Sequence, residues 1–531
     1  MTIFRSPFPD IQVPPVSLPR FLFGALDPAD ATRPAVVDAA SGSGYTFGQL
    51  VEAVGQVAGA LAARGLGRGD VAALFAPNSP DYPVIFHGVL AAGAAASPVN
   101  ALYTAAELAD QLRDSGARIV FTDADGLARA REAVAEPGVG VRQIVVTGPR
   151  PGGPDNDNGR VAVPGFEEFL ANAGPPPEIE IGPEELAALP YSSGTTGRSK
   201  GVMLTHRNLV ANLLQLGPMG RIDAGSRLLA VLPLFHIFGL TGILNQGLHH
   251  RALVVTMPRF DLAGFLAAIQ QHRIDHLSIV PPIAVALAKS PLVDDYDLSS
   301  VRVLRCAAAP LDAGLAQAVA DRLDATVVQG YGLTESSPGL HSTPADRPDI
   351  DPGSIGVLMP NVEARVVDPG TGQNVPVGER GELWCRGPNI MRGYLNNPEA
   401  TAAAIDADGF LHTGDLVTVD EQGVFRVVGR LKELIKYKGH QVAPAELEAV
   451  LLAHPEVADA AVVGVPDLDS GELPKAFVVR REGHAQLGAQ QLMDYVAGQV
   501  APHKKVRLVE FVDRIPKSTA GKILRNQLRV R

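Results

Sequence analysis

The segment YSSGTTGRSKGV spans residues 191–202 and contains three glycines, six hydroxyl side chains and one lysine. This composition offers little to a hydrophobic core, but the N–H groups of a glycine-rich turn can converge on an anion, and a lysine adds a positive charge. A Walker A loop would need a glycine directly before the lysine. Here Ser199 precedes Lys200, and Gly201 follows it. The segment therefore predicts a phosphate-binding loop of another type, and the rest of the chain must identify it.

The composition is that of a large globular protein. The chain has 531 residues, of which 46% are hydrophobic and 19% are charged, so we expect a packed interior and several domains. A net charge of −11 argues against a nucleic-acid partner, which would require a broad basic face. Cys306 and Cys385 are too few for a disulfide framework and lack the spacing of a metal site. Together these features predict a cytoplasmic protein.

The N-terminal sequence MTIFRSPFPDIQVPP lacks the apolar core of a signal peptide. The run from Val84 to Val99 is the most apolar of the chain, but it is short and contains His87. It predicts a buried helix, and no membrane span is expected.

Helical and strand patterns alternate up to about Pro352. Apolar residues from Phe47 to Leu61 recur at the spacing of one helical face. The apolar run VAALF predicts a buried strand, and similar runs begin at Arg118, Gln143, Leu228, Ala252, His276 and Val301. This alternation is typical of α/β layers around largely parallel sheets. The stretch from Gly148 to Gly159 consists almost entirely of turn residues and predicts an exposed loop.

The pattern changes in the last third of the chain. Glycine turns and alternating strands such as GELWCRG and VFRVVG predict a β-rich subdomain, and the last hundred or so residues read as a small α+β unit. The predicted fold class is therefore α/β. We expect a large N-terminal domain of α/β layered subdomains plus the β-rich subdomain, residues 1–428, and a small α+β C-terminal domain, residues 429–531.

Four further stretches combine glycine, hydroxyl and charged residues. They are LPLFHIFGL from Leu232, VVQGYGLTES from Val327, FLHTGDL from Phe410 together with VVGRLKELIKYKGHQVAPAE from Val427, and PKSTAGKILR from Pro516. With the opening segment, they make the chain resemble the adenylate-forming superfamily of acyl-CoA synthetases, firefly luciferases and peptide-synthetase adenylation domains. RLKELIKYKGHQVAPAELE and IFRSPFPDI are especially similar to 4-coumarate:CoA ligases.

The resemblance implies two half-reactions. A carboxylate first attacks the α-phosphate of ATP, which yields acyl-AMP and pyrophosphate, and the acyl group then passes to the thiol of coenzyme A. Between them the C-terminal domain rotates, and the position of Gly429 corresponds to the hinge, where the family often has aspartate. Charge develops on phosphate oxygens in the first step, so donors and cations must already surround them.

The resemblance also assigns site residues. ATP or the adenylate would be bound by Ser192, Ser193, Gly194, Thr195, Thr196, Lys200, Gln329, Gly330, Tyr331, Gly332, Thr334, Asp415, Arg430, Lys432 and Gln441. Glu335 would hold Mg²⁺, which prefers carboxylate and phosphate oxygens. Coenzyme A would contact Arg259, Lys438 and Gly439. The acyl substrate would contact His236, Phe238, Ala307, Gly330, Pro338 and Gly339. Lys522, His236 and Lys436 are the expected catalytic residues.

The acid itself is left open by the sequence. Phe238 and Gly339 depart from the plant coumarate ligases, so the leading hypothesis of a hydroxycinnamate such as 4-coumarate competes with a medium- or long-chain fatty acid. A second alternative is an adenylating enzyme that loads a carrier protein, and a third is a nucleotide-binding scaffold without activity. The sequence does not distinguish a monomer from a homodimer.

Overall fold

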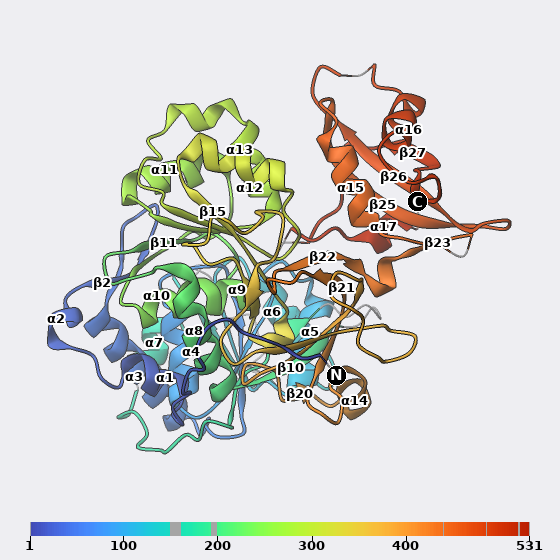
Figure 1. Ribbon diagram of the computed structural model, residues 1–531. Helices are drawn as coiled ribbons and strands as arrows, with labels where there is room; N and C mark the ends of the chain where they lie inside the picture. The colour runs from blue at the N-terminus through green and yellow to red at the C-terminus, as the bar shows by residue number, and fades with distance from the viewer. Residues whose placement is uncertain are drawn as a thin grey trace.

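The computed structural model describes residues 2–148, 161–171, 173–192, 199–438, 440–484, 486–518 and 521–529. Figure 1 shows a large body formed by the N-terminal and middle parts of the chain, with the C-terminal part standing to one side of it. Of the predicted exposed loop, only Gly148 belongs to the described residues. In this described part, no helix has the length and apolar character that crossing a bilayer requires.

The first large sheet has the strand order β20-β10-β8-β5-β4-β6-β7, with β9 paired to β10. Its strands are β4 (Val71–Phe75), β5 (Ala95–Pro98), β6 (Ile119–Thr122), β7 (Gln143–Val146), β8 (Leu186–Ala188), β9 (Tyr191–Ser192), β10 (Lys200–Thr205) and β20 (Gly393–Tyr394). The neighbouring pairs from β8 to β7 are parallel, whereas β9, β8 and β20 run antiparallel to β10. The helices of this region are α3 (Phe47–Ala63), α4 (Asp81–Ala91), α5 (Ala105–Ser115), α6 (Leu127–Ala135) and α7 (Phe166–Ala171).

Helix α3 confirms the helical pattern predicted from Phe47. It begins at a capping box, in which the Thr46 hydroxyl accepts the Gln49 N–H and the Gln49 side chain accepts the Thr46 N–H. The prediction of one helix from Val84 to Val99 is wrong in its second half. Helix α4 ends at Ala91, and the chain continues as strand β5. Gly93 lies between them at φ 81°, a left-handed conformation that ends the helix.

The second large sheet has the order β17-β16-β15-β14-β13-β11-β12-β2-β3. Its strands are β2 (Pro34–Asp38), β3 (Gly44–Thr46), β11 (Arg227–Ala230), β12 (Leu253–Thr256), β13 (His276–Ile279), β14 (Val303–Cys306), β15 (Thr326–Gly332), β16 (Gly339–Ser342) and β17 (Val357–Leu358). From β2 to β15 the neighbours are parallel, as the sequence pattern predicts. The helices here are α1 (Leu18–Phe23), α2 (Pro28–Ala31), α8 (His206–Gly220), α9 (Ile237–Gly239), α10 (Gln246–His249), α11 (Leu262–His272), α12 (Pro281–Lys289) and α13 (Ala313–Leu323), with a π-helix at Leu240–Asn245.

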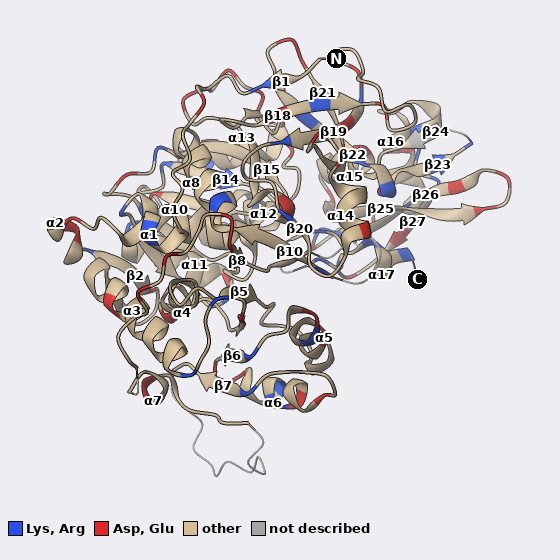
Figure 2. Ribbon diagram, turned by 90° about the horizontal axis from the view of Figure 1, so that it is seen from below, with Lys and Arg blue, Asp and Glu red and all other residues tan. Residues whose placement is uncertain are grey.

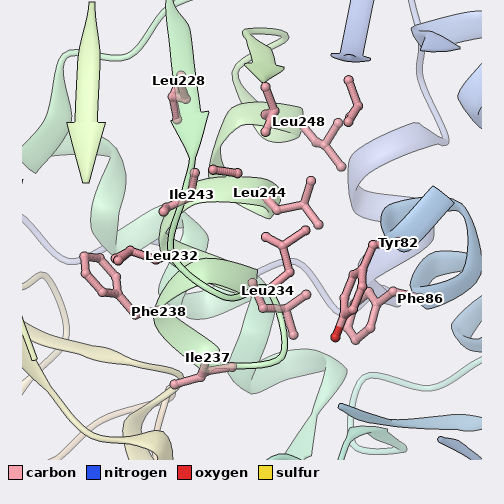
Figure 3. Packing of buried hydrophobic residues seen from close by; sticks show 14 of the residues in the cluster. Tyr82, Phe86, Leu228, Leu232, Leu234, Ile237, Phe238, Ile243, Leu244 and Leu248 are labelled. Carbon is pink, nitrogen blue, oxygen red and sulfur yellow. The ribbon is translucent and has the colours of Figure 1, made fainter. Parts of the chain in front are cut away.

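The main core lies between these two sheets. Figure 3 shows how side chains from Leu228 to Leu248 gather with Tyr82 and Phe86 of α4. This segment contains Phe235, His236 and Phe238, so the histidine motif is built directly onto the core. Burial of so many large apolar side chains stabilises the platform that carries the motif.

The β-rich subdomain is a five-stranded sheet in the order β1-β18-β19-β21-β22. It consists of β1 (Phe4–Arg5), β18 (Glu363–Val367), β19 (Gly381–Arg386), β21 (Leu411–Val419) and β22 (Phe425–Arg430), with α14 (Pro398–Ala404) beside it. Every neighbouring pair is antiparallel. The predicted change to β-rich structure is confirmed.

The C-terminal part forms a sheet in the order β24-β23-β26-β25, with β27 paired to β26; Figure 2 labels these strands in a second view. Its elements are β23 (Ile435–Tyr437), β24 (His440–Val442), α15 (Pro444–Ala453), β25 (Val457–Asp467), β26 (Gly471–Arg480), α16 (Ala489–Ala497), β27 (Leu508–Phe511) and α17 (Arg525–Arg529). This sheet and its helices have a hydrophobic core of their own, which runs from Ile435 to Val506. The α+β prediction is therefore confirmed.

Candidate active site

Asp415 lies in β21, and it is buried. One carboxylate oxygen accepts a hydrogen bond of 2.6 Å from Arg430 Nε, and the other accepts one of 2.7 Å from the Tyr331 hydroxyl. Asp415 and Arg430 are direct partners across the β21 and β22 pair, so the sheet register creates this ion pair. Burial, and then the charge of Asp415, raise the pKa of Tyr331, so this phenol remains a donor. The structure thus joins three of the expected adenylate residues through both oxygens of one carboxylate.

The QGYG segment, residues 329–332, is the end of strand β15. Gln329 does not point into open space: its amide donates to the carbonyls of Leu311 and Pro352 and accepts the Leu311 N–H. A Cβ on Gly332 would lie 1.8 Å from the Pro338 carbonyl oxygen, so only glycine permits this close approach. Gln329 and Gly332 therefore hold the strand that presents Tyr331.

Glu335 is buried in the short 3₁₀ helix Thr334–Ser336, one residue after Thr334. Its Oε1 atom accepts two hydrogen bonds of 2.9 Å, one from the Ser192 hydroxyl and one from the Tyr394 hydroxyl. Lys200 is close by, with its Nζ atom 4.8 Å from the centre of the Tyr394 ring. The first phosphate-loop residues and the expected metal ligand are thus brought together.

These residues fit a magnesium ion that accompanies a nucleotide. In the described residues, no group of three or more His, Cys, Asp or Glu side chains could hold a metal ion. A single carboxylate suffices for Mg²⁺, because this ion keeps several waters and takes substrate phosphate oxygens as its remaining ligands. Since both protein donors use Oε1, Oε2 of Glu335 has no hydrogen-bond partner among the residues described.

Lys522 is brought to the same region from the C-terminal part of the chain. Burial lowers its pKa, the charge of Arg430 adds to this effect, and the carboxylates of Glu433 and Asp415 oppose it. The preceding Gly521 has φ 78°, and a Cβ there would lie 3.3 Å from side-chain atoms of Val280 and of Pro282 in α12. The lysine loop therefore packs against the large domain, with its ammonium group near the Asp415 pair.

His236 caps the short helix α9, and its Nδ1 atom accepts the Phe238 N–H at 3.3 Å. Burial lowers the pKa of His236 to about 4, so the imidazole is neutral at physiological pH. Phe238 is buried, and its ring lies 2.9 Å from where a Cβ on Gly242 would be. The histidine can thus act as a neutral polar group in apolar surroundings.

The other expected acyl-binding residues divide into two places. A Cβ on Gly330 would lie 3.7 Å from Arg305 Cδ and 3.8 Å from Ala307 Cβ, so these three residues are neighbours. A Cβ on Gly339 would instead meet Met359 at 2.8 Å and Asn212 at 3.5 Å, and Gly339 directly follows Pro338.

Several basic residues that are expected at the adenylate or at coenzyme A are at the surface. Lys432, Lys436 and Lys438 are exposed on the segment that leads into the C-terminal sheet, and Arg259 is exposed on the loop after β12. Some expected residues lie outside the described residues: Ser193, Gly194, Thr195, Thr196, Gly439 and the side chain of Gln441.

Two residues at the site were missed by sequence reasoning. Arg305 is a buried cation in β14, with no hydrogen bond or ion pair in the described residues, and burial lowers its pKa to about 10. The feature of the sequence that could have revealed Arg305 is its charge inside the largely apolar run VRVLRCAAA. Tyr394 gave a weaker signal, because a tyrosine after glycine is common in loops, and only the pairing of β20 with β10 brings it to Glu335.

Comparisons with known proteins agree with this geometry. The family model described as AMP-binding enzyme matches residues 28–395, and the model of the AMP-binding enzyme C-terminal domain matches residues 446–522. The chain belongs to the AMP-binding enzyme family.

Relatives in this family include acid:CoA ligases. The chain is 41% identical to 4-coumarate–CoA ligase 2 of Nicotiana tabacum over 539 residues, which covers 100% of this chain and 97% of the relative. The ATP-bound crystal structure of MatB from Rhodopseudomonas palustris has a TM-score of 0.87 and 33% identity, and covers 97% of this chain and 99% of that one. The anthranilate CoA ligase AuaEII in complex with anthranoyl-AMP has a TM-score of 0.87 and 29% identity, with 98% of each chain covered. The expected resemblance to adenylate-forming acyl-CoA ligases is confirmed.

Proposed function

We propose that this member of the AMP-binding enzyme family is an ATP-dependent acid:CoA ligase that acts on a hydroxycinnamate-like acid. The observation that carries the proposal is the convergence of Asp415, Glu335 and Lys522, from three separate parts of the chain, near the end of β15 that contains Tyr331. The proposed division is a large domain, residues 1–428, and a mobile domain, residues 429–531, and the separate core of the C-terminal sheet supports it. The free, buried thiols of Cys306 and Cys385 support a reducing cytoplasm as its location.

In the first half-reaction, the acid carboxylate attacks the α-phosphorus of ATP and pyrophosphate leaves. Asp415 is proposed to bind the ribose hydroxyls, in exchange for its present donors. Lys522 places an ammonium group beside the carboxylate and the phosphate, which lowers the energy of the charged transition state. Lys200 and Glu335 act at the leaving phosphates, where a bound Mg²⁺ would supply charge neutralisation.

In the second half-reaction, the coenzyme A thiol attacks the acyl carbon and AMP leaves. The domain carrying Lys522 is proposed to turn away first, and its loop would then leave Val280 and Pro282. Lys438, Gly439 and Arg259 are proposed to contact coenzyme A. Because the imidazole of His236 is neutral, it adds no charge to the path of the thiol. It is proposed either to accept a hydrogen bond or to let the thiol pass.

Arg305 favours an acid with an oxygen atom at its far end. A buried guanidinium without a partner is costly, and an aliphatic tail beside Ala307 and Gly330 would leave it unpaired. A phenol oxygen can accept its N–H groups, which would stabilise the bound acid. This argument favours 4-coumarate over a medium- or long-chain fatty acid.

The test measures thioester formation with 4-coumarate, cinnamate and octanoate, at saturating ATP, Mg²⁺ and coenzyme A. We expect 4-coumarate to have the highest kcat/KM. Because loss of a hydrogen bond to a charged group typically costs about 1.5–3 kcal/mol, Arg305→Met should reduce the preference for 4-coumarate over cinnamate by ~10-fold or more. Arg302→Met is the matched control, because Arg302 is exposed and pairs with Asp275.

Three results would contradict the proposal. A preference for octanoate that survives in Arg305→Met would favour a fatty acyl-CoA ligase. Pyrophosphate exchange without any thioester would favour an enzyme that loads a carrier protein. Absence of pyrophosphate exchange with every acid would favour a scaffold without activity.

A further inference from the structure

Glu335 is oriented by its protein partners before any ligand binds. Both the Ser192 hydroxyl and the Tyr394 hydroxyl donate to the same atom, Oε1, each at 2.9 Å. The Met391 N–H donates to the backbone carbonyl of Glu335 at 2.8 Å, so the main chain is also held. Because the two side-chain donors share Oε1, Oε2 keeps its lone pairs for a cation.

Tyr394 comes from a distant part of the sequence and is firmly placed. It lies on β20 opposite Val202 of β10, two residues from Lys200. Its backbone N–H donates to the Thr401 hydroxyl at 2.9 Å, and a Cβ on the preceding Gly393 would clash with that threonine side chain. Strand β20 is thus fixed between β10 and helix α14.

The tyrosine ring has a second contact. The Nζ atom of Lys200 lies 4.8 Å from the ring centre, within the range of a cation–π interaction. One side chain therefore touches both a carboxylate and a lysine that are expected at the phosphates.

We propose that Tyr394 is a positioning residue, which sets the metal-binding oxygen of Glu335 at a fixed place relative to Lys200. This inference rests on the proposed function, in which Glu335 holds the metal and Lys200 the phosphates. Partners that orient a ligating carboxylate tune metal affinity without touching the metal themselves. The hydroxyl acts on Glu335 and the ring acts on Lys200, so the two effects can be separated by substitution.

The experiment measures binding of Mn²⁺, a paramagnetic substitute for Mg²⁺, to the full chain with α,β-methylene-ATP, by electron paramagnetic resonance. Tyr394→Phe keeps the ring beneath Lys200 and removes the donor to Glu335. We expect it to weaken Mn²⁺ binding about 10-fold or more, since loss of such a partner costs roughly 10–100-fold in metal affinity. Adenylation by this variant should recover to near the wild-type kcat at saturating Mg²⁺.

Two further variants complete the test. Tyr394→Leu removes the ring as well, so affinity for the nucleotide without metal should also fall, which Tyr394→Phe should leave unchanged. Tyr45→Phe is the matched control, because it breaks a hydrogen bond of 2.6 Å between a half-buried tyrosine and the carboxylate of Asp81, away from this site. Its Mn²⁺ binding should equal that of the wild type. Melting temperatures identify any variant that does not fold.

Unchanged Mn²⁺ binding in folded Tyr394→Phe would overturn the inference and leave the proposed function intact. The same is true of a kcat that stays low at every Mg²⁺ concentration, which a purely structural role would produce. Failure of the wild-type chain to bind the metal and nucleotide together would instead overturn the proposed function, and this inference with it.

Discussion

Lys522 shows how one residue can combine two requirements of the proposed chemistry. Its ammonium group must be charged to help the first half-reaction, yet it lies in a half-buried place near the Arg430 cation. Burial, followed by the charge of Arg430, lowers its pKa, while the Glu433 and Asp415 carboxylates limit the shift. The residue thus loses its proton at a lower pH than an exposed lysine would.

The prediction at the residue scale is that Lys522→Ala separates the half-reactions. Acyl-AMP formation should fall about 100-fold or more, since one preorganised donor to a charged transition state is worth ~2.7–4 kcal/mol. Thioester formation from supplied acyl-AMP should stay near wild type. In the wild type, the adenylation rate should decline as the pH rises through the lowered pKa of this lysine. Single-turnover measurements of each step check this, and equal losses in both steps would contradict it.

Among the elements, the end of β22 is where the proposed hinge begins. Gly429 is opposite Leu416 in this strand, and Arg430 is the last strand residue before the 3₁₀ turn Leu431–Glu433. A Cβ on Gly429 would lie 3.3 Å from the Cβ of Ala443, just before α15. In this conformation the glycine thus has ordinary strand geometry. Its visible role is to let α15 approach β22 closely.

The prediction at the element scale concerns Gly429→Pro. Proline fixes φ near −65° and removes the N–H, so it should restrict the pivot that the domain rotation needs. We expect acyl-AMP formation to persist and thioester formation to fall about 10-fold or more, because restricting a gating motion limits the step that depends on it. Gly429→Ala is the control: it adds only the Cβ near Ala443 and should retain both steps. Wild-type rates of both steps in folded Gly429→Pro would mean that the hinge lies elsewhere.

At the scale of the whole molecule, the core contains neutral histidines. Burial lowers the pKa of His87 to about 3, that of His206 to about 4 and that of His341 to about 3. His87 packs edge-on against Phe23 and Phe86, and neither ring nitrogen has a hydrogen-bond partner among the described residues. Each such histidine binds a proton in the unfolded chain near pH 6.5 but not in the folded one.

The prediction at this scale is a loss of stability on mild acidification. The folded pKa values are depressed, so the stability is fully present above pH 6.5 and falls as the pH drops toward 4, by about 1.4 kcal/mol per pH unit for each group. Between pH 7 and pH 5, the melting temperature of His87→Leu should therefore fall less than that of the wild type. His440→Leu, at an exposed histidine, should behave like the wild type. Identical pH profiles for His87→Leu and the wild type would contradict the role given to burial.

The sequence by itself determined the elements and the family. The helical face from Phe47, the apolar strand runs and the turn to β-rich structure after Pro352 are local patterns, and the structure reproduces them because propensity and periodicity act over a few residues. The prediction from the sequence was wrong where a single glycine determines the structure. Gly93 ends helix α4 and so divides one apolar run between a helix and a strand. Motifs such as QGYGLTE and HTGD also contain the expected residue types in the expected order along the chain. Most of the expected site residues could therefore be named from these motifs.

Only the tertiary structure decided which of those residues meet, because contacts between distant segments depend on sheet register and domain packing. Arg430 reaches Asp415 since β21 and β22 pair in that register, and Lys522 reaches the same place since its loop packs on α12. Gln329 is expected at the adenylate, and only the structure shows that its amide donates to the carbonyls of Leu311 and Pro352. Tyr394 and Arg305 emerged only from the fold. The pairing of β20 with β10 brings Tyr394 to Glu335, which is 59 residues away in sequence, and the lack of a partner for the Arg305 cation depends on everything packed around it.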